Sequence, residues 1–118
     1  MPDTIQVSIV VPTYNRKSLL QDCLQSLLHQ DLPPSTLELV VVDDGSTDGT
    51  PELVRNLLRA QIPVRLIYHR QENRGVSAAR NQGFSISSGP FVGFIDDDEI
   101  VPPDWTRKAL NMLKTDPD

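Results

Sequence analysis

Three consecutive carboxylates, Asp96, Asp97 and Asp98, form the strongest chemical signal in the sequence. They follow the apolar run of residues 91–95, at the point where a buried strand would end. Neighbouring carboxylates repel one another unless a cation or hydrogen-bond donors compensate them. Alternate residues of an extended segment project to the same side, so Asp96 and Asp98 can share a ligand. Mg²⁺ and Mn²⁺ take oxygen ligands and keep positions open for substrate phosphates, so the triplet favours a metal site over a solvated acidic turn.

A second pair of carboxylates, Asp43 and Asp44, follows the apolar run of residues 37–42. Asp-Gly pairs form tight turns, which accounts for Gly45 and Gly49 but not for both carboxylates. We expect one of the two carboxylates to be structural. The other can accept a hydrogen bond from the N–H group of a nucleobase, which suits a pyrimidine imide.

Tyr14 and Arg80 are further candidates for a ligand site. Tyr14 comes soon after the apolar run of residues 7–11, and its ring can pack on a nucleobase face while nearby backbone groups bond the base edge. Ordinary packing is the alternative for this ring. Arg80 lies in a predicted helix, where it can pair with a site carboxylate, face a phosphate or remain a solvated surface residue.

Short apolar runs alternate with amphipathic segments along the chain, and this alternation predicts the fold. We expect strands at residues 7–11, ended by Pro12, and at residues 37–42, 64–68 and 91–95. We expect helices at residues 19–28, from the N-cap Thr50 onward, at residues 76–87 and from residue 104. Near-continuous apolar runs are typical of strands buried on both faces. The prediction is therefore a three-layer α/β fold with a doubly wound, mainly parallel, Rossmann-like sheet in the strand order 3-2-1-4.

This strand order gives the polar clusters one location. In such sheets ligands bind beyond the carboxyl ends of the strands at the switch point, which here lies between the first and fourth strands. Every apolar run leads into polar residues, so we expect Tyr14, the carboxylate pair and the acidic triplet to meet at one edge of the sheet. Small residues such as Gly83 let the third helix approach the sheet closely.

Charge and composition narrow the class of protein. The 118 residues carry a formal net charge of −5, with scattered basic residues, so we exclude nucleic acid as a partner. An acidic protein can still bind an anionic ligand when a divalent cation lies between them. The single cysteine, Cys23, excludes an internal disulfide and is expected to be a buried, inert thiol. The sequence has no signal peptide and no apolar run that could span a membrane. We expect a cytoplasmic location, with any contact to the cytoplasmic face of a membrane made through further segments.

Several familiar site patterns are missing from the sequence. It has neither a P-loop motif nor a Gly-x-Gly-x-x-Gly fingerprint, and its first turn contains no glycine. These absences argue against P-loop enzymes, dinucleotide oxidoreductases and nucleotidyltransferases. The sequence has no Cys/His zinc pattern and no nucleophile elbow. A receiver domain would need a lysine near the end of a late strand, and none is available.

Five blocks of sequence, in order along the chain, carry a family resemblance. They are VVPTYN at residues 10–15, VDDGSTD at 42–48, NRG at 73–75, ARNQG at 79–83 and FIDDD at 94–98. Together they resemble the family 2 glycosyltransferases of GT-A fold over nearly the whole chain. The resemblance implies inverting transfer of a sugar from a UDP- or GDP-linked nucleotide-sugar donor to a hydroxyl of a saccharide or other acceptor.

The resemblance also implies roles for individual residues. Pro12, Thr13 and Tyr14 would line the nucleoside pocket, and Asp44 would contact the base. Asp97 would sit near the ribose or the metal, while Asp98 would coordinate Mn²⁺ or Mg²⁺ bridging the diphosphate and Asp96 would complete the Asp-x-Asp motif. The donor-binding candidates are Pro12, Thr13, Tyr14, Asn15, Asp43, Asp44, Arg80, Asp96 and Asp97, and the metal candidates are Asp96 and Asp98.

Relatives of this type place their general base well downstream of the Asp-x-Asp motif. We find no candidate base before Asp118, because Glu99 is better explained as a structural neighbour of the triplet. We therefore expect residues 1–118 to be the nucleotide-sugar-binding part of a glycosyltransferase domain, truncated before the acceptor half. A non-catalytic nucleotide- or metal-binding module is the alternative.

Overall fold

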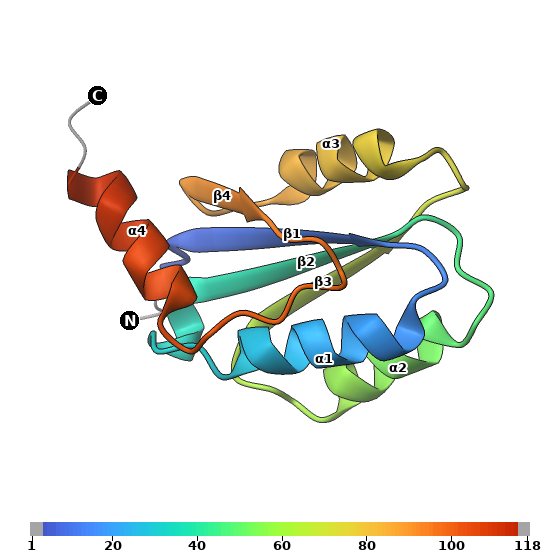
Figure 1. Cartoon of the computed structure of the whole chain (residues 1–118), viewed down its shortest axis with the longest axis horizontal. Helices are drawn as coiled ribbons and strands as arrows, with labels where there is room; N and C mark the ends of the chain where they lie inside the picture. Colours follow the sequence, from blue (N-terminus) through green and yellow to red (C-terminus); the bar gives the residue numbers. More distant parts are fainter. Residues whose placement is uncertain (1–3, 116–118) are drawn as a thin grey trace.

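The computed structural model describes residues 4–115 as three layers, with helices on both faces of one sheet (Figure 1). The strands are β1 (Val7–Thr13), β2 (Leu37–Asp43), β3 (Arg65–Arg70) and β4 (Phe91–Phe94). The helices are α1 (Lys17–Leu28), α2 (Thr50–Arg59), α3 (Val76–Ile86) and α4 (Trp105–Thr115), with a short 3-10 helix at Pro34–Thr36. All strand pairs are parallel, and the order is β3-β2-β1-β4. The predicted fold class and strand order are confirmed.

Residue parity along the strands divides the core between the two faces of the sheet. Ile9 and Leu39 belong to the larger cluster, which packs under α1 and α2. Val10 and Val40 belong to a smaller cluster with Ala79 of α3. Every residue of β1 and β2 is buried, as expected for central strands of a parallel sheet covered on both sides.

Cys23 of α1 lies in the larger core cluster with no exposed surface. Burial, followed by the nearby negative charges of Asp97 and Glu99, raises the pKa of its thiol to about 12. The thiol is therefore protonated at neutral pH, which confirms the expectation of a buried, inert cysteine.

Several predicted boundaries differ from the structure, among them that of β3, which runs to Arg70 instead of residue 68, and two of the differences have a clear physical cause. Strand β1 continues through Pro12 to Thr13 instead of stopping at the proline. The carbonyl of Val10 accepts the Ile95 N–H, so even-numbered residues of β1 turn their backbone groups toward β4. Pro12 has no backbone N–H to donate. Because β4 ends at Phe94, no strand residue lies beside Pro12 on that edge, and the proline costs the sheet no hydrogen bond.

The second wrong boundary is the start of α2. Gly49, with φ 94°, is the N-cap, and Thr50 is the first helical residue. Asp48 takes the capping role that we assigned to Thr50, because its carboxylate accepts from the backbone N–H and the hydroxyl of Thr50. Its other oxygen accepts the backbone N–H of Lys17, so one side chain serves the first turns of both α1 and α2.

Close packing of α3 depends on Gly83. A Cβ at this position would lie 2.3 Å from Cγ1 of Val10 and 3.2 Å from Cγ2 of Val42. Both valines are fully buried, so neither can move aside easily.

We expect Gly83→Ala to lower the free energy of unfolding by about 1–3 kcal/mol, because the added methyl overpacks the contact between α3 and the sheet. Urea unfolding followed by circular dichroism measures this change. The exposed Asn81→Ala on the same helix is the control and should change stability little. Equal stability of the Gly83→Ala variant and the unsubstituted chain would contradict the packing argument.

Candidate functional site

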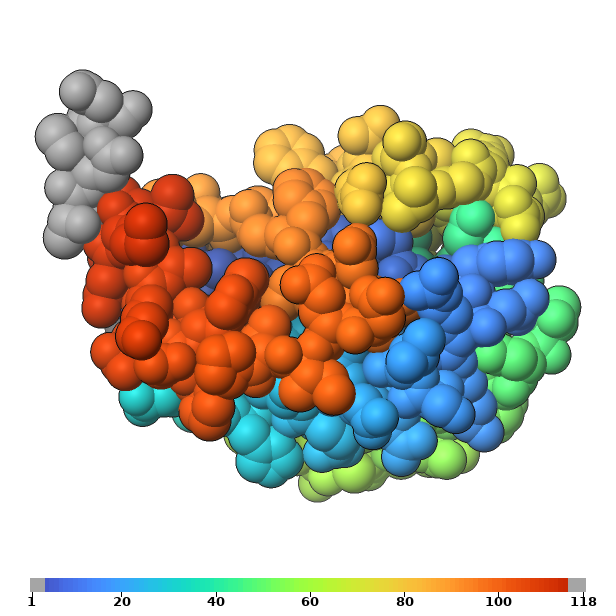
Figure 2. Space-filling model, in the orientation of Figure 1, coloured from blue at the N-terminus to red at the C-terminus, as the bar shows by residue number. Residues whose placement is uncertain are grey.

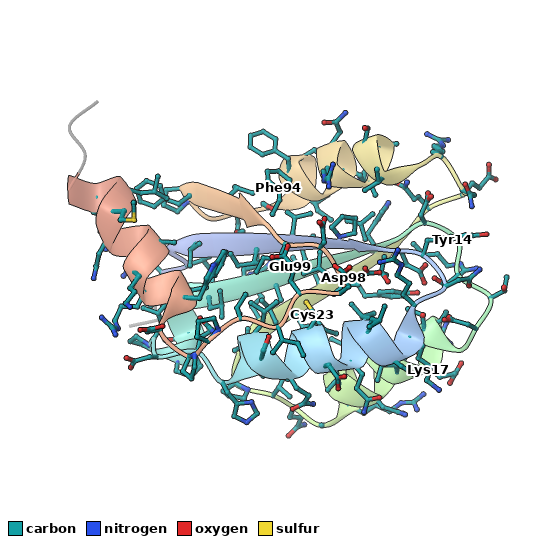
Figure 3. The ribbon with its side chains drawn as sticks, viewed as in Figure 1. Tyr14, Lys17, Cys23, Phe94, Asp98 and Glu99 are labelled. Carbon is teal, nitrogen blue, oxygen red and sulfur yellow. The ribbon has the colours of Figure 1, made fainter. Side chains whose placement is uncertain are left out.

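A cavity of about 440 Å³ opens where β4 has left the sheet and β1 continues. Figure 2 shows the surface hollowed between the yellow atoms of α3 and the blue atoms at the start of α1. Tyr14, from the β1–α1 connection, and Asp98, from the segment after β4, lie near this end of the sheet (Figure 3). The lining residues are Pro12, Thr13, Tyr14, Arg16, Asp44, Val76, Ala79, Asp96, Asp97 and Asp98.

Asp97 is the buried member of the acidic triplet, with 5% of its surface exposed. Its carboxylate accepts a hydrogen bond from Thr13 Oγ1 at 2.9 Å and another from Arg16 Nη1 at 3.2 Å. Burial raises the pKa of this carboxyl group above its ordinary value, although Thr13 and Arg16 act in the opposite direction. Asp97 therefore joins the segment after β4 to the end of β1.

Asp96 and Asp98 flank this buried carboxylate and point to solvent, with 59% and 50% of their side chains exposed. Arg80 Nη2 lies 3.2 Å from Asp96, and Arg16 Nη1 lies 3.6 Å from Asp98. Glu99 accepts the backbone N–H of Asp96, which agrees with its expected structural role in this turn.

Asp44 is the member of the second pair that lines the cavity. Its carboxylate accepts three hydrogen bonds, from Gln71 Nε2 and from the backbone N–H groups of Arg74 and Gly75, at 2.8–3.0 Å. Burial alone would raise the pKa of Asp44, but these donors hold it below its ordinary value. The group is ionised at neutral pH, and its Oδ2 accepts only the Gly75 N–H among these bonds.

Asp43 lies outside the cavity and has no exposed surface. It accepts bonds from the Ser46 N–H, the Tyr68 hydroxyl and Arg70. Burial, followed by the bond to Asp43, raises the pKa of Tyr68 to about 12. Asp43 is therefore the structural member of the pair, and the structure does not bring it to the cavity with Tyr14, Asp44 and the acidic triplet.

Asn15 also holds the surrounding loops and is absent from the cavity lining. Its backbone N–H donates to Ser46 Oγ at 2.9 Å, and its Oδ1 accepts the Thr47 N–H at 2.7 Å. These bonds tie the β1–α1 turn to the β2–α2 turn and thereby position Tyr14, whose exposed fraction is 45%.

Sequence reasoning missed Arg16, Val76 and Ala79 as lining residues. Arg16 directly follows the VVPTYN block, so its place after a strand end was the signal that could have identified it. Val76 and Ala79 carry no chemical signal of their own, because only the packing of α3 decides which apolar side chains face the cavity.

The described residues contain no preformed cluster of three or more His, Cys, Asp or Glu side chains that could hold a metal ion. Mg²⁺ and similar cations are commonly held by one or two carboxylates together with substrate phosphates, instead of a complete protein cage. The exposed oxygens of Asp96 and Asp98 beside an open cavity fit this type of site.

No helix within residues 4–115 has the length and apolar character needed to cross a membrane.

Comparison with known proteins decides the family. The sequence matches the family described as Glycosyl transferase family 2 over residues 8–118. This chain belongs to glycosyltransferase family 2.

Two curated relatives illustrate the match. Glycosyltransferase AglE of Haloferax volcanii is 35% identical over 91% of this chain and 35% of its own length. Validoxylamine A glucosyltransferase of Streptomyces hygroscopicus subsp. limoneus is 39% identical over 88% of this chain and 23% of its own length. The chain thus spans about a third or less of these relatives.

Solved structures confirm the GT-A fold. The mannosyltransferase PcManGT from Pyrobaculum calidifontis, in complex with GDP-Man and Mn²⁺, has a TM-score of 0.85 and 35% identity, covering 98% of this chain and 34% of that one. S. aureus TarS 1-349, in complex with UDP-GlcNAc, has a TM-score of 0.84 and 31% identity, covering 93% and 31%. The family resemblance inferred from the five sequence blocks is confirmed.

The hydrogen bonds to Asp44 predict a pH-dependent contribution to stability. Its folded pKa is depressed, so the stabilisation is present above the ordinary carboxyl pKa of about 3.9 and is lost as the pH falls through the lower folded value. We expect Asp44→Asn to lower the free energy of unfolding at pH 7 by about 1–3 kcal/mol, since its amide cannot accept all three bonds. The difference should narrow below about pH 4. Urea unfolding at several pH values measures it, and a constant difference across this range would contradict the assignment.

Proposed function

We propose that this chain forms the donor and metal site of an inverting, metal-dependent glycosyltransferase. The reaction transfers a sugar from a nucleotide-diphospho-sugar to a hydroxyl of a saccharide or other acceptor. The observation that carries the proposal is the lining of the cavity, which combines the aromatic ring of Tyr14 with the exposed carboxylates of Asp96 and Asp98. We assign the nucleoside to the part of the cavity at Tyr14, the nucleoside end, and a cation-bound diphosphate to the part at Asp96 and Asp98, the diphosphate end.

The nucleoside end of the cavity offers stacking and one oriented acceptor. The half-exposed Tyr14 ring can pack on the face of a base. Asp44 lines the same cavity and is ionised, and its Oδ2, which also accepts the Gly75 N–H, would accept the N–H group that uracil and guanine both present at their pairing edge. Asp97, which Thr13 fixes in the cavity lining, would lie near the ribose or the metal.

The diphosphate end needs a cation. Four aspartates and one arginine line the cavity, so an anionic donor would be repelled without a positive charge between them. Asp96 and Asp98 would hold Mn²⁺ or Mg²⁺, whose chemistry is Lewis-acid stabilisation of the departing diphosphate. The neighbour solved with GDP-Man and Mn²⁺ and the neighbour solved with UDP-GlcNAc support a donor that is GDP- or UDP-linked.

Inversion requires a base that deprotonates the acceptor hydroxyl as it attacks the anomeric carbon opposite the diphosphate. Glu99 is engaged with the backbone of Asp96, and the carboxylates of the cavity belong to the donor and metal. We therefore propose that the base, and the acceptor site with it, lie outside the residues of this chain, in agreement with its spanning about a third or less of its relatives. The present chain supplies donor and metal binding.

Isothermal titration with UDP, GDP and their sugar derivatives, with and without Mn²⁺, tests the proposal. We expect one nucleotide to bind in a metal-dependent manner, and Asp98→Ala to remove most of that dependence. The exposed Asp22→Ala on α1 is the control and should bind like the unsubstituted chain. The proposal fails if no nucleotide binds in the presence of Mn²⁺, or if Asp98→Ala leaves the metal-dependent binding intact.

Tyr14 allows a separate test of the nucleoside end. Stacking of a base on an aromatic side chain contributes about 1–3 kcal/mol, so Tyr14→Ala should weaken nucleotide binding roughly 5- to 150-fold. Tyr14→Phe keeps the ring and should bind within about twofold of the unsubstituted chain. Equal loss in both variants would show that the hydroxyl, and not the ring face, contacts the ligand.

A further inference from the structure

Arg16 is the cationic side chain within the cavity lining, and the proposed function gives it no role. Its Nη1 lies 3.2 Å from Oδ1 of Asp97 and 3.6 Å from Oδ2 of Asp98. The guanidinium is therefore positioned on one of the two proposed metal-binding carboxylates. Arg80 pairs with Asp96, but it is absent from the lining.

We propose that Arg16 couples metal binding to donor binding. In the metal-free site it occupies Asp98, and when a divalent cation takes this carboxylate, Arg16 turns to the phosphates of the donor. This inference rests on the proposed function, because it assigns a role to Arg16 in the same donor and metal site.

The two contacts of Arg16 differ in a way that permits this exchange. Asp97 is buried and is fixed by Thr13, so the 3.2 Å contact can hold the guanidinium beside the cavity. Asp98 is half exposed and lies farther away, at 3.6 Å, so solvent screens this contact more strongly. Loss of Asp98 to a metal ion would leave Arg16 near the cavity and not release it into solvent.

The guanidinium also has donors available for a second anion. Both contacts to the carboxylates use Nη1. An arginine side chain carries five N–H groups in a planar fork, and this fork matches the oxygens of a phosphate. A diphosphate bound across the cavity can therefore meet a cationic donor that the metal ion has displaced from Asp98.

In this proposal Arg16 has opposite effects on the affinities for metal and for nucleotide. Without nucleotide, a metal ion must compete with Arg16 for Asp98, so Arg16 weakens metal binding. With nucleotide, the displaced guanidinium binds phosphate, so Arg16 strengthens nucleotide binding in the presence of metal. Each ligand then raises the affinity of the site for the other by the same factor, as thermodynamic linkage requires.

Mn²⁺ titration without nucleotide, with free Mn²⁺ measured by electron paramagnetic resonance, is the first test. We expect Arg16→Ala to bind Mn²⁺ roughly three- to tenfold more tightly than the unsubstituted chain, because a competing charge is gone. Arg55→Ala is the matched control, since Arg55 is 53% exposed and pairs with Glu52 outside the cavity. It should leave Mn²⁺ affinity unchanged. Equal or weaker Mn²⁺ binding by Arg16→Ala overturns the proposal.

The second test repeats the titration with UDP and with GDP. The ratio of Mn²⁺ affinities with and without the nucleotide that binds measures the coupling, and we expect Arg16→Ala to reduce this ratio about tenfold or more. Arg16→Lys keeps the charge but not the fork, so its Mn²⁺ affinity without nucleotide should stay near that of the unsubstituted chain, with the coupling partly restored. An unchanged ratio in Arg16→Ala overturns the proposal.

Asp98→Asn separates the proposed exchange from a general effect of charge. In this background Arg16 has lost its exposed partner, so adding Arg16→Ala should no longer tighten Mn²⁺ binding to the remaining carboxylates. A gain as large as in the unsubstituted background overturns the proposal. Far-UV circular dichroism verifies that each variant is folded.

The two proposals fail in different ways. If the unsubstituted chain binds neither nucleotide with Mn²⁺, the proposed function fails and the inference falls with it. If the unsubstituted chain shows coupled binding while Arg16→Ala behaves like Arg55→Ala, the inference alone fails and the proposed function stands.

Discussion

The hydrogen bond from Thr13 to Asp97 holds the site together at the point where the sheet opens. Strand β4 pairs with β1 only as far as Phe94 and Val10, while β1 continues for three more residues. The Thr13 hydroxyl lies 2.9 Å from Asp97 and reconnects the two segments beyond that separation. Within residues 4–115, this is the hydrogen bond that ties the end of β1 itself to the acidic triplet.

This single contact also decides the roles within the triplet. Asp97 and Asp98 lie in a turn that the Glu99 N–H closes onto the Asp96 carbonyl, and within this turn Asp97 is the residue that points inward, to Thr13 and Arg16. Asp96 and Asp98 are the exposed carboxylates. One charge is thus buried and two others lie on the cavity rim, where solvent and ligands reach them. The cost of burying Asp97 is visible in its raised pKa, which burial dominates.

The alternation of apolar runs and amphipathic segments was sufficient to predict the fold and its strand order. It was also sufficient to bring Tyr14, Asp44 and the triplet to one edge, because parallel strands deliver their carboxyl ends together. The separate roles of Asp43 and Asp44 did not follow from residue type, since both are aspartates after the same strand. Strand parity would have separated them: Asp44 continues the series of Val40 and Val42, which pack with Ala79 at the cavity side of the sheet. To assign these roles from the sequence, the register of β2, the strand that ends at Asp43, had to be known first.

Arg16 escaped the sequence prediction for a different reason. Its place after a strand end could have indicated that it lines the cavity, but its two contacts, at 3.2 and 3.6 Å, are to residues more than 80 positions away, and no local pattern encodes such distances. The N-cap of α2 was missed on a smaller scale, because Thr50 and Gly49 are both acceptable caps and only the left-handed φ of Gly49 distinguishes them. Strand and helix periodicity therefore predict which segments meet, while contacts between turns decide what their side chains do.

The four aspartates of the cavity are compensated to different degrees, and this difference gives the site its chemistry. Asp44 receives three hydrogen bonds, two of them from backbone N–H groups that cannot move away. Asp97 receives Thr13 and the nearer contact of Arg16. Asp98 has the longer contact of the same arginine, at 3.6 Å, and is half exposed. A cation entering the cavity would therefore gain most at Asp98, where the least compensation has to be displaced, and it would leave Asp44 undisturbed. In the proposed site, recognition of the base at Asp44 would thus be separate from recognition of the diphosphate, although one acidic cavity contains both carboxylates.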